Sequence, residues 1–254
     1  MSSEKTYQST VSYVNAPIVE AILEVSIHRT APIQLSELAS VVEDDNAYPQ
    51  RVDLIIASGQ MTVGPKVSAS ASSQQIGYQF VNADRTIIIH CKQDGLAISR
   101  MKPYTDWAHV FGEFKRFWGR YVSLIKPEII RQIAVRYVNR FDLPGSKIEL
   151  SDYFRTYPQV SEDIQADLSG FLNQLQIPQL DIQGHAVITQ VGVPPAFPGV
   201  ISILLDIVVS LPQDKPATND AIDLPMETLH RRKNELFEAC MKPAARDLIR
   251  ETQS

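Results

Sequence analysis

Charged side chains recur in segments that are otherwise apolar, and these are the residues most able to do chemistry. Six of them form a candidate polar cluster: Glu20, Glu24, His28, Arg136, Arg140 and Asp206. Carboxylates beside a histidine could act as a general acid and base in a hydrolase or a nuclease. Arginine binds carboxylates in a bidentate fork, so the same residues could instead neutralise one another. The cluster is therefore a catalytic site, a surface on which another chain docks, or a solvated sheet face.

Among the residues of this cluster, Arg136 allows the most specific prediction. It lies in the strand-like segment IAVRYVNRFDLP, whose alternate residues are apolar. A buried guanidinium group needs a carboxylate, because an unpaired charge in the interior costs several kcal/mol. We therefore expect Arg136 to be substantially buried and to have a carboxylate within salt-bridge distance. Glu20, Glu24 and Asp206 are the candidates, with Glu20 or Glu24 favoured. Replacement of Arg136 by alanine would then destabilise the protein by about 3–5 kcal/mol.

A second group of polar residues lies near the C-terminus, in LHRRKNELFEACM. Arg231, Arg232, Lys233 and Asn234 are adjacent there and form a candidate basic helix patch. Such a patch could contact phosphate groups or an acidic partner. A short run of charges on an amphipathic helix is more often a solvated face, so both interpretations are kept.

Motifs that would fix a reaction are absent from the sequence. We find neither GxxxxGK[ST] nor GxGxxG, and neither HExxH nor GxSxG. The five histidines are scattered, and Cys91 and Cys240 form no CxxC pair. We therefore expect no metal and no cofactor, while the question of enzymatic activity stays open.

Composition narrows the class of protein. The chain has 254 residues, of which 44% are hydrophobic and 21% charged, and its net charge is −5. This negative balance argues against nucleic acid as a partner, and no apolar run is long enough to span a membrane. The N-terminus has no apolar signal segment, and two isolated cysteines are typical of a reducing compartment. We expect a cytoplasmic protein.

Hydrophobic periodicity places the charged residues on an antiparallel sheet. Alternation predicts strands over 17–28 and 129–141, three short strands within 76–101, and a hairpin over 185–193 and 200–210. The Ser/Ala/Gly-rich stretch 58–75 is expected to be a loop or a weak edge strand, and helical segments are expected near 36–42, 152–157 and 166–175.

Two longer helices complete the expected architecture. Residues 105–125 show helical spacing of large aromatic side chains, with Thr105 as a candidate N-cap, and a second helix begins near Met226. The predicted fold class is α+β, with an antiparallel sheet or sheets covered on one face by two long amphipathic helices. We expect a single unit over 1–254. The halves 15–127 and 128–250 both read as β-α-β(n)-α, which is consistent with a duplication and equally with two unrelated α+β halves.

Five blocks of the sequence occur together in one known family. They are PIVEAILEV, SRMKPYTDW, RQIAVRYVN, LLDIVVS and LHRRKNELFEACM, and they cover nearly the whole chain in order. In these blocks the chain resembles an uncharacterised, sporadically distributed family of bacterial proteins of about this length. The final block departs from the family pattern at Cys240-Met241-Lys242, where an Ile-Thr-like segment is usual. The resemblance implies one intact unit in a bacterial cytoplasm and supplies no site residues.

These observations favour a non-enzymatic binding protein that engages a protein partner or associates with itself through an exposed sheet face. One alternative is a hydrolase or nuclease that uses carboxylates and a histidine on the sheet face. A further alternative is a protein with a pocket for a small ligand between helix and sheet. The position of Glu24, Arg136 and Asp206, in a cleft or in ion pairs, would distinguish these functions.

Overall fold

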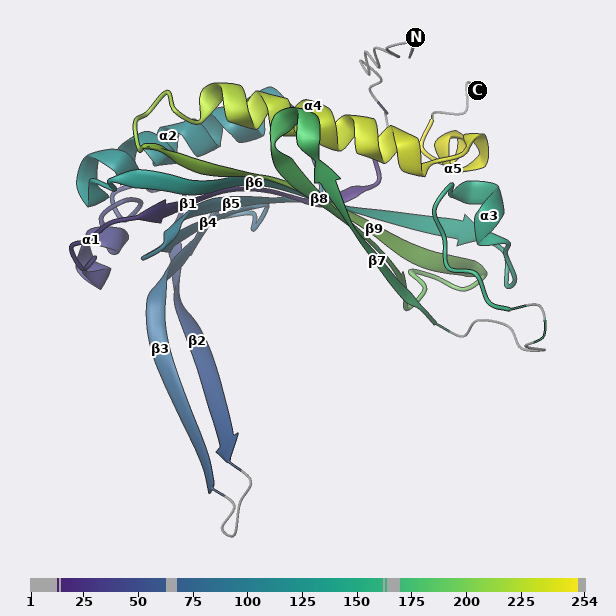
Figure 1. Cartoon of the computed structure of the whole chain (residues 1–254), viewed down its shortest axis with the longest axis horizontal. Coiled ribbons are helices and arrows are strands. Elements are labelled where there is room, and N and C mark those ends of the chain that lie inside the picture. The colour runs from purple at the N-terminus through teal and green to yellow at the C-terminus, as the bar shows by residue number, and fades with distance from the viewer. Residues whose placement is uncertain (1–12, 14, 63–67, 162, 164–169, 251–254) are drawn as a thin grey trace.

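One large antiparallel sheet dominates the protein (Figure 1). The computed structural model describes the chain except for residues 1–12, 14, 63–67, 162, 164–169 and 251–254. Within the described residues nine strands are joined in the order β2-β3-β4-β5-β1-β6-β9-β8-β7. The strands are β1 (Ile18–His28), β2 (Gln50–Thr62), β3 (Ser68–Val81), β4 (Ile87–Lys92), β5 (Gly95–Met101), β6 (Ile129–Pro144), β7 (Leu172–Gln179), β8 (Gly184–Val193) and β9 (Val200–Pro216).

The helices are unequal in length. They are α1 (Leu35–Ala39), α2 (Trp107–Ile125), α3 (Leu150–Tyr153), α4 (Asp223–Cys240) and α5 (Pro243–Asp247), with a 3-10 turn η1 (Leu180–Ile182). Figure 1 shows α2 and α4 side by side above the middle of the sheet, while the β2–β3 hairpin projects away from them as a long arm.

The predicted fold class, a sheet covered on one face by two long helices, is wrong. The protein is mainly one broad sheet, and α1, α3 and α5 each have five residues or fewer. Nine strands about 4.8 Å apart span roughly 38 Å, whereas two helices about 10 Å wide cover only about half of that width. The outer strands and the β2–β3 arm therefore extend beyond the helices.

Two segments account for the missed strands. The stretch 58–75 was expected to be a loop or a weak edge strand. Much of it belongs to β2 and β3, which pair from Gln50↔Val81 to Thr62↔Ser68, and β2 does lie at an edge of the sheet. On this arm Ile55 is 56% exposed, so the apolar alternation that marks a half-buried strand is absent. The helix expected over 166–175 is also wrong where it can be compared, since β7 begins at Leu172 and residues 164–169 lie outside the described part.

The aromatic face of α2 packs into the core, as its periodicity predicts. Phe114, Phe117, Trp118 and Tyr121 are buried, and the indole N–H of Trp118 donates to the Thr218 carbonyl at 3.1 Å. The burial of each such ring stabilises the fold by about 1.5–3 kcal/mol before entropy is subtracted. The N-cap is Asp106, whose side chain accepts from the His109 N–H at 2.7 Å, and not the predicted Thr105.

The two halves of the chain meet at the centre of the sheet. In the first half β1 lies beside β5, the last strand of its meander, and in the second half β6 lies beside β9 in the same way. The first strands of both halves then pair with each other, with Leu23 opposite Val135. Counted outward from the centre, the first half has the order β1-β5-β4-β3-β2 and the second half the order β6-β9-β8-β7, which is one strand shorter. An origin by duplication stays a prediction.

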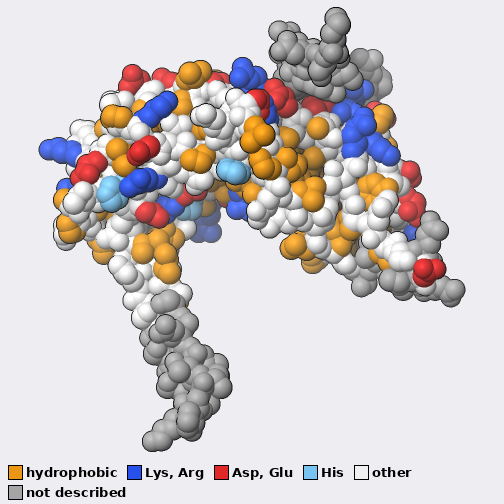
Figure 2. Space-filling view, viewed as in Figure 1, with side chains coloured by type: hydrophobic (Ala, Val, Ile, Leu, Met, Phe, Trp, Pro, Cys, Tyr) orange, Lys and Arg blue, Asp and Glu red, His pale blue; other side chains and the backbone are white. Residues whose placement is uncertain are grey.

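The sheet has one apolar face and one mixed face. Leu23, Val135 and Leu205 are buried on the side of α2 and α4, as alternation predicts. Residues of the opposite parity, such as Glu24 and Arg136, lie on the other face. On the view of Figure 2, lysine and arginine (blue) are interspersed with aspartate and glutamate (red). This view of the molecule shows no extended surface of one charge.

Candidate ligand pocket

The residues of the candidate polar cluster are engaged mainly in separate ion pairs. Glu24 pairs with Lys92 across strands, and Arg140 pairs with Asp142 at 3.0 Å. His28 is exposed at the end of β1, and within the described part of the chain Glu20 has no ion-pair partner. The cluster therefore shares a sheet face but does not converge in a cleft.

Arg136 has a carboxylate partner, as expected, but the partner is Asp206 and not the favoured Glu20 or Glu24, and the expected burial is wrong. Its side chain is 45% exposed, and its guanidinium group binds Asp206 in a fork, with Nε–Oδ1 at 2.9 Å and Nη2–Oδ2 at 2.8 Å. The two glutamates lie on β1, whereas Asp206 lies on β9, on the other side of Arg136. An exposed pair of this kind contributes only about 0–1 kcal/mol, so the large predicted effect of the alanine substitution is withdrawn.

The candidate basic patch of α4 does not form one cationic surface. Arg231 is exposed, whereas Arg232 forms ion pairs with Asp181 and with Glu235, the latter at 2.8 Å. Asn234 is half-buried, and Lys233 is buried with only 6% of its surface exposed. The four adjacent residues thus point in different directions, and one of them faces the interior.

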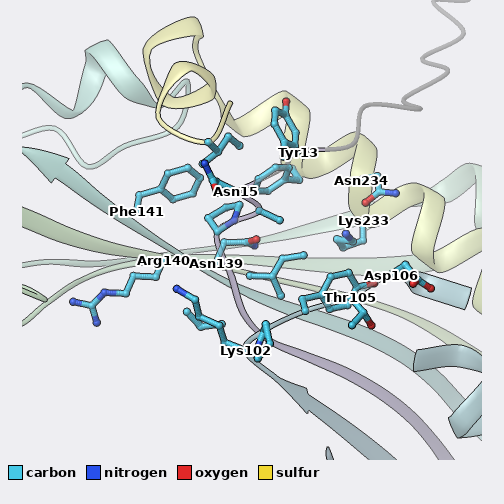
Figure 3. Close-up of a pocket in the computed structure, with 18 of the residues that line it drawn as sticks. Tyr13, Asn15, Lys102, Thr105, Asp106, Asn139, Arg140, Phe141, Lys233 and Asn234 are labelled. Atoms are coloured by element: carbon cyan, nitrogen blue, oxygen red, sulfur yellow. The ribbon is translucent and has the colours of Figure 1, made fainter. Parts of the chain in front are cut away.

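Lys233 faces a cavity of about 720 Å³ between α4 and the central strands (Figure 3). Five segments line this cavity: residues 15–19 before and within β1, 102–107 after β5, 139–142 of β6, 230–238 of α4, and 248–249 after α5. In Figure 3, Lys233 lies beneath α4 on the side of the central strands. The cavity has the size of a pocket for a small molecule.

The ammonium group of Lys233 has an aromatic ring as its neighbour and no counter-charge. Its Nζ atom lies 3.6 Å from the centroid of the Tyr137 ring, a cation–π contact. Among the described residues none offers Nζ a carboxylate or a hydrogen-bond acceptor. Burial lowers the pKa of Lys233 to about 7, because desolvation disfavours the charged form. Near neutral pH the amine and the ammonium forms are therefore both populated.

Aromatic and hydroxyl groups form the wall beside Lys233. The hydroxyl groups of Tyr104 and Tyr137 are hydrogen-bonded at 2.9 Å. The rings of Trp107 and His230 are stacked, with centroids 4.1 Å apart, and the indole N–H donates to Glu227 at 2.7 Å. Burial, followed by the charge of Lys233, lowers the pKa of His230 to about 3, so its ring is neutral at physiological pH.

The acidic side chains that line the cavity already have partners. Glu238 accepts from Arg246 at 2.9 Å and from the Tyr13 hydroxyl at 2.7 Å. Asp142 binds Arg140, and Asp106 caps α2. The other lining cation, Lys102, is exposed and has no ion pair within the described chain. The lining therefore has three cationic and three anionic side chains, and within the described chain its two lysines, Lys102 and Lys233, are the cations without an ion pair.

Sequence reasoning placed the site elsewhere, although a signal was present. Lys233 lies four residues after Leu229 and four before Phe237, on the apolar stripe of its helix, where a charged residue is exceptional. Four of the five blocks quoted from the sequence contribute residues to the lining. They supply Pro17–Val19, Lys102–Trp107, Asn139, and His230, Lys233, Asn234 and Phe237.

A metal centre is not apparent in the described part of the chain. No group of three or more histidine, cysteine, aspartate or glutamate side chains is arranged there to hold an ion. Comparisons of the sequence with models of protein families and with curated proteins found no match. What the chain does must therefore be argued from the pocket and the sheet themselves.

Proposed function

We propose that the protein binds a small organic anion in the cavity beneath α4, with Lys233 as its counter-charge. The observation that carries this proposal is a buried lysine that faces the cavity and lacks a carboxylate partner in the described chain. An unpaired ammonium group in the interior costs several kcal/mol. An anionic ligand would remove that cost, so the free energy of pairing would favour the complex.

The rest of the lining supports an anion that also carries an apolar or planar group. Tyr104, Trp107 and Phe237 present aromatic surface, and Lys102 adds a second positive charge at the exposed side of the cavity. Aromatic side chains bind planar ligands through stacked or edge contacts. The proposed ligand is therefore a carboxylate or phosphate joined to a hydrophobic body.

The first experiment compares an anion with its neutral isostere. Phenylacetate and phenylacetamide are titrated by calorimetry into the wild-type protein, into Lys233→Met, and into Lys215→Met as an exposed lysine control. We expect phenylacetate to bind wild type and Lys215→Met at least roughly tenfold more tightly than it binds Lys233→Met, and phenylacetamide to bind all three weakly. Equal phenylacetate affinity in wild type and Lys233→Met would contradict the proposal.

The same titration gives an independent readout through protons. An anion beside Lys233 favours the ammonium form and raises its pKa from about 7. Binding at pH 8 should therefore take up protons, which is measured from the dependence of the binding enthalpy on the ionisation enthalpy of the buffer. If the Lys233→Met variant still binds the ligand weakly, that binding should take up no protons.

A second candidate function is association with a protein partner or with a second copy of the chain. The mixed sheet face carries the half-buried aliphatic residues Ile22, Leu204 and Val208 between its ion pairs, and the β2 arm exposes Ile55 and Ile56. Light scattering during gel filtration would test self-association, and Val208→Lys should dissociate any oligomer formed through this face. The hydrolase or nuclease alternative has less support, because Glu24 and Asp206 are engaged with cations.

We also propose a cytoplasmic location. Cys91 and Cys240 are free and buried, which suits a reducing compartment. Among the described residues, no helix combines the length and the apolar character needed to cross a bilayer. Fractionation of the native cells would test the location.

A further inference from the structure

We propose that Lys233 forms a reversible imine with its ligand, and that the ligand is a 2-oxo acid with a hydrophobic side chain. This inference rests on the proposed anion-binding function, since the carboxylate is what holds the carbonyl carbon near Nζ. It goes beyond simple pairing because it assigns covalent chemistry to one atom of the chain.

The amine of Lys233 is available for reaction. Lys233 is buried and lines the cavity, and its Nζ atom contacts the Tyr137 ring without an ion pair or hydrogen bond among the described residues. With a pKa of about 7, half of its side chains are neutral at pH 7. A lysine with the ordinary pKa of about 10.4 is neutral about a thousandfold less often at that pH. Desolvated lysines in apolar pockets are the usual imine-forming nucleophiles.

A pair of hydroxyl groups lies beside the amine. The Tyr137 ring that contacts Nζ carries a hydroxyl group that is hydrogen-bonded to Tyr104, a residue of the cavity lining, at 2.9 Å. Burial raises the pKa of Tyr104 to about 12 and that of Tyr137 well above its usual value. Both hydroxyl groups are therefore protonated at neutral pH. Their mutual hydrogen bond uses one proton, so the other can be donated to the ligand.

The reaction balances with the groups that are present. The lone pair of Nζ attacks the carbonyl carbon, a C–N bond forms, and the C=O π pair moves to oxygen, which is protonated while nitrogen loses a proton. The hydroxyl of this carbinolamine takes up a second proton and leaves as water while the nitrogen lone pair forms C=N. Amine, ketone and one proton thus give an iminium ion and water, and no oxidant or reductant is required.

A 2-oxo acid suits this chemistry better than another carbonyl compound because it brings its own negative charge. Its carboxylate is bonded directly to the carbonyl carbon, so it lies next to the iminium nitrogen after reaction. The positive charge at Lys233 is then paired in both the non-covalent and the covalent complex. A neutral aldehyde would leave the iminium ion unpaired in the interior, which costs several kcal/mol.

The experiment uses phenylpyruvate as the probe and phenyllactate, which has an alcohol in place of the ketone, as its control. The full-length protein is incubated at pH 7.5 with each compound and cyanoborohydride, and lysine adducts are mapped by peptide mass spectrometry. We expect phenylpyruvate to modify Lys233 at least roughly tenfold more than the exposed Lys215, because only the former is a desolvated amine. Phenyllactate should bind by calorimetry and leave no adduct.

The possible outcomes separate the two proposals. Binding of both compounds with no more adduct at Lys233 than at Lys215 overturns the imine and leaves anion binding intact. Failure of both compounds to bind, together with no preferred adduct, removes both proposals. Because the adduct is mapped in the wild-type chain, the result does not depend on whether a variant folds.

Discussion

Replacing Lys233 with methionine should stabilise the ligand-free protein, and the gain should be larger at low pH. Methionine is an unbranched side chain one heavy atom shorter than lysine, and it removes the charge. Replacement of a buried ionic group by a hydrophobic one of similar size commonly stabilises by about 1–4 kcal/mol. The absence of a carboxylate partner for Lys233 in the described chain places it in this class.

The pH dependence follows from the lowered pKa of Lys233. Its pKa is about 7 in the folded protein and 10.5 in the reference state. Below pH 7 both states bind the proton, and the native state bears the full penalty of burial. Between pH 7 and 10.5 the unfolded state retains a proton that the native state has lost, so the stability of the wild-type protein rises with pH. From pH 6 to pH 9 this contribution grows by about 2–3 kcal/mol, at a limiting slope of about 1.4 kcal/mol per pH unit.

Urea denaturation followed by circular dichroism measures this contribution. The unfolding free energies of wild type, Lys233→Met and the control Lys215→Met are compared at pH 6 and pH 9. The advantage of Lys233→Met over wild type should be about 2–3 kcal/mol larger at pH 6 than at pH 9. Burial raises the pKa of Cys91 and of Cys240, but both thiols are present in all three proteins, so their titration cancels in the difference.

Two results would refute this reasoning. An advantage of equal size at both pH values would mean that Lys233 titrates alike in the folded and unfolded protein. A Lys233→Met protein less stable than wild type at pH 6 would mean that the ammonium group has a partner that the contacts described above do not include. Either result would also remove the argument for an anionic ligand.

Three further substitutions test other parts of the structure. Arg136→Ala should cost about 0–1 kcal/mol, because its pair with Asp206 is exposed; a coupling energy of several kcal/mol in a double-mutant cycle would show that the pair is buried in solution. Tyr104→Phe should slow adduct formation with phenylpyruvate by roughly tenfold or more while phenyllactate affinity changes little, since general acid catalysis contributes about 10²–10⁴-fold; an unchanged rate would exclude a role for the hydroxyl pair. Gly77→Ala should prevent normal folding, because a Cβ atom would lie 2.0 Å from the carbonyl oxygen of Cys91 on the neighbouring strand; a soluble variant with wild-type thermal stability would contradict the close approach of β3 and β4.

The central strands and α2 could be predicted from the sequence because each has one face buried in the core. In β1 and β6 the residues of one parity, such as Leu23 and Val135, are fully buried, so a period of two is visible. In α2 the rings from Phe111 to Tyr121 repeat at helical spacing for the same reason. When one face of a strand or helix is buried, apolar residues must recur along the sequence at the period of that element.

The β2–β3 arm and β7 could not be predicted in this way. Ile55 and Leu172 are largely exposed, so backbone pairing rather than side-chain burial defines these strands. The sequence also could not decide which carboxylate binds Arg136, because it does not specify whether β1 or β9 presents the nearer one. Strand order decides this, and strand order depends on the whole sheet.

The pocket could be predicted only in part. Lys233 on an apolar helical stripe is a local signal, visible in the sequence alone. Its convergence with Tyr104 and Tyr137 depends on contacts between segments that are far apart in the chain. Local periodicity carries no information about such contacts.

The position of the pocket at the junction of the two halves links ligand binding to their association. Lys102 and Tyr104 come from the first half, whereas Asn139 and Lys233 come from the second. Neither half alone presents the complete lining, so a ligand that contacts both binds only the assembled sheet. By mass action, such a ligand adds its binding free energy to the interaction between the halves. A chain cut between α2 and β6, at Lys126-Pro127, would then behave as a sensor whose two fragments are held together more tightly when the ligand is present.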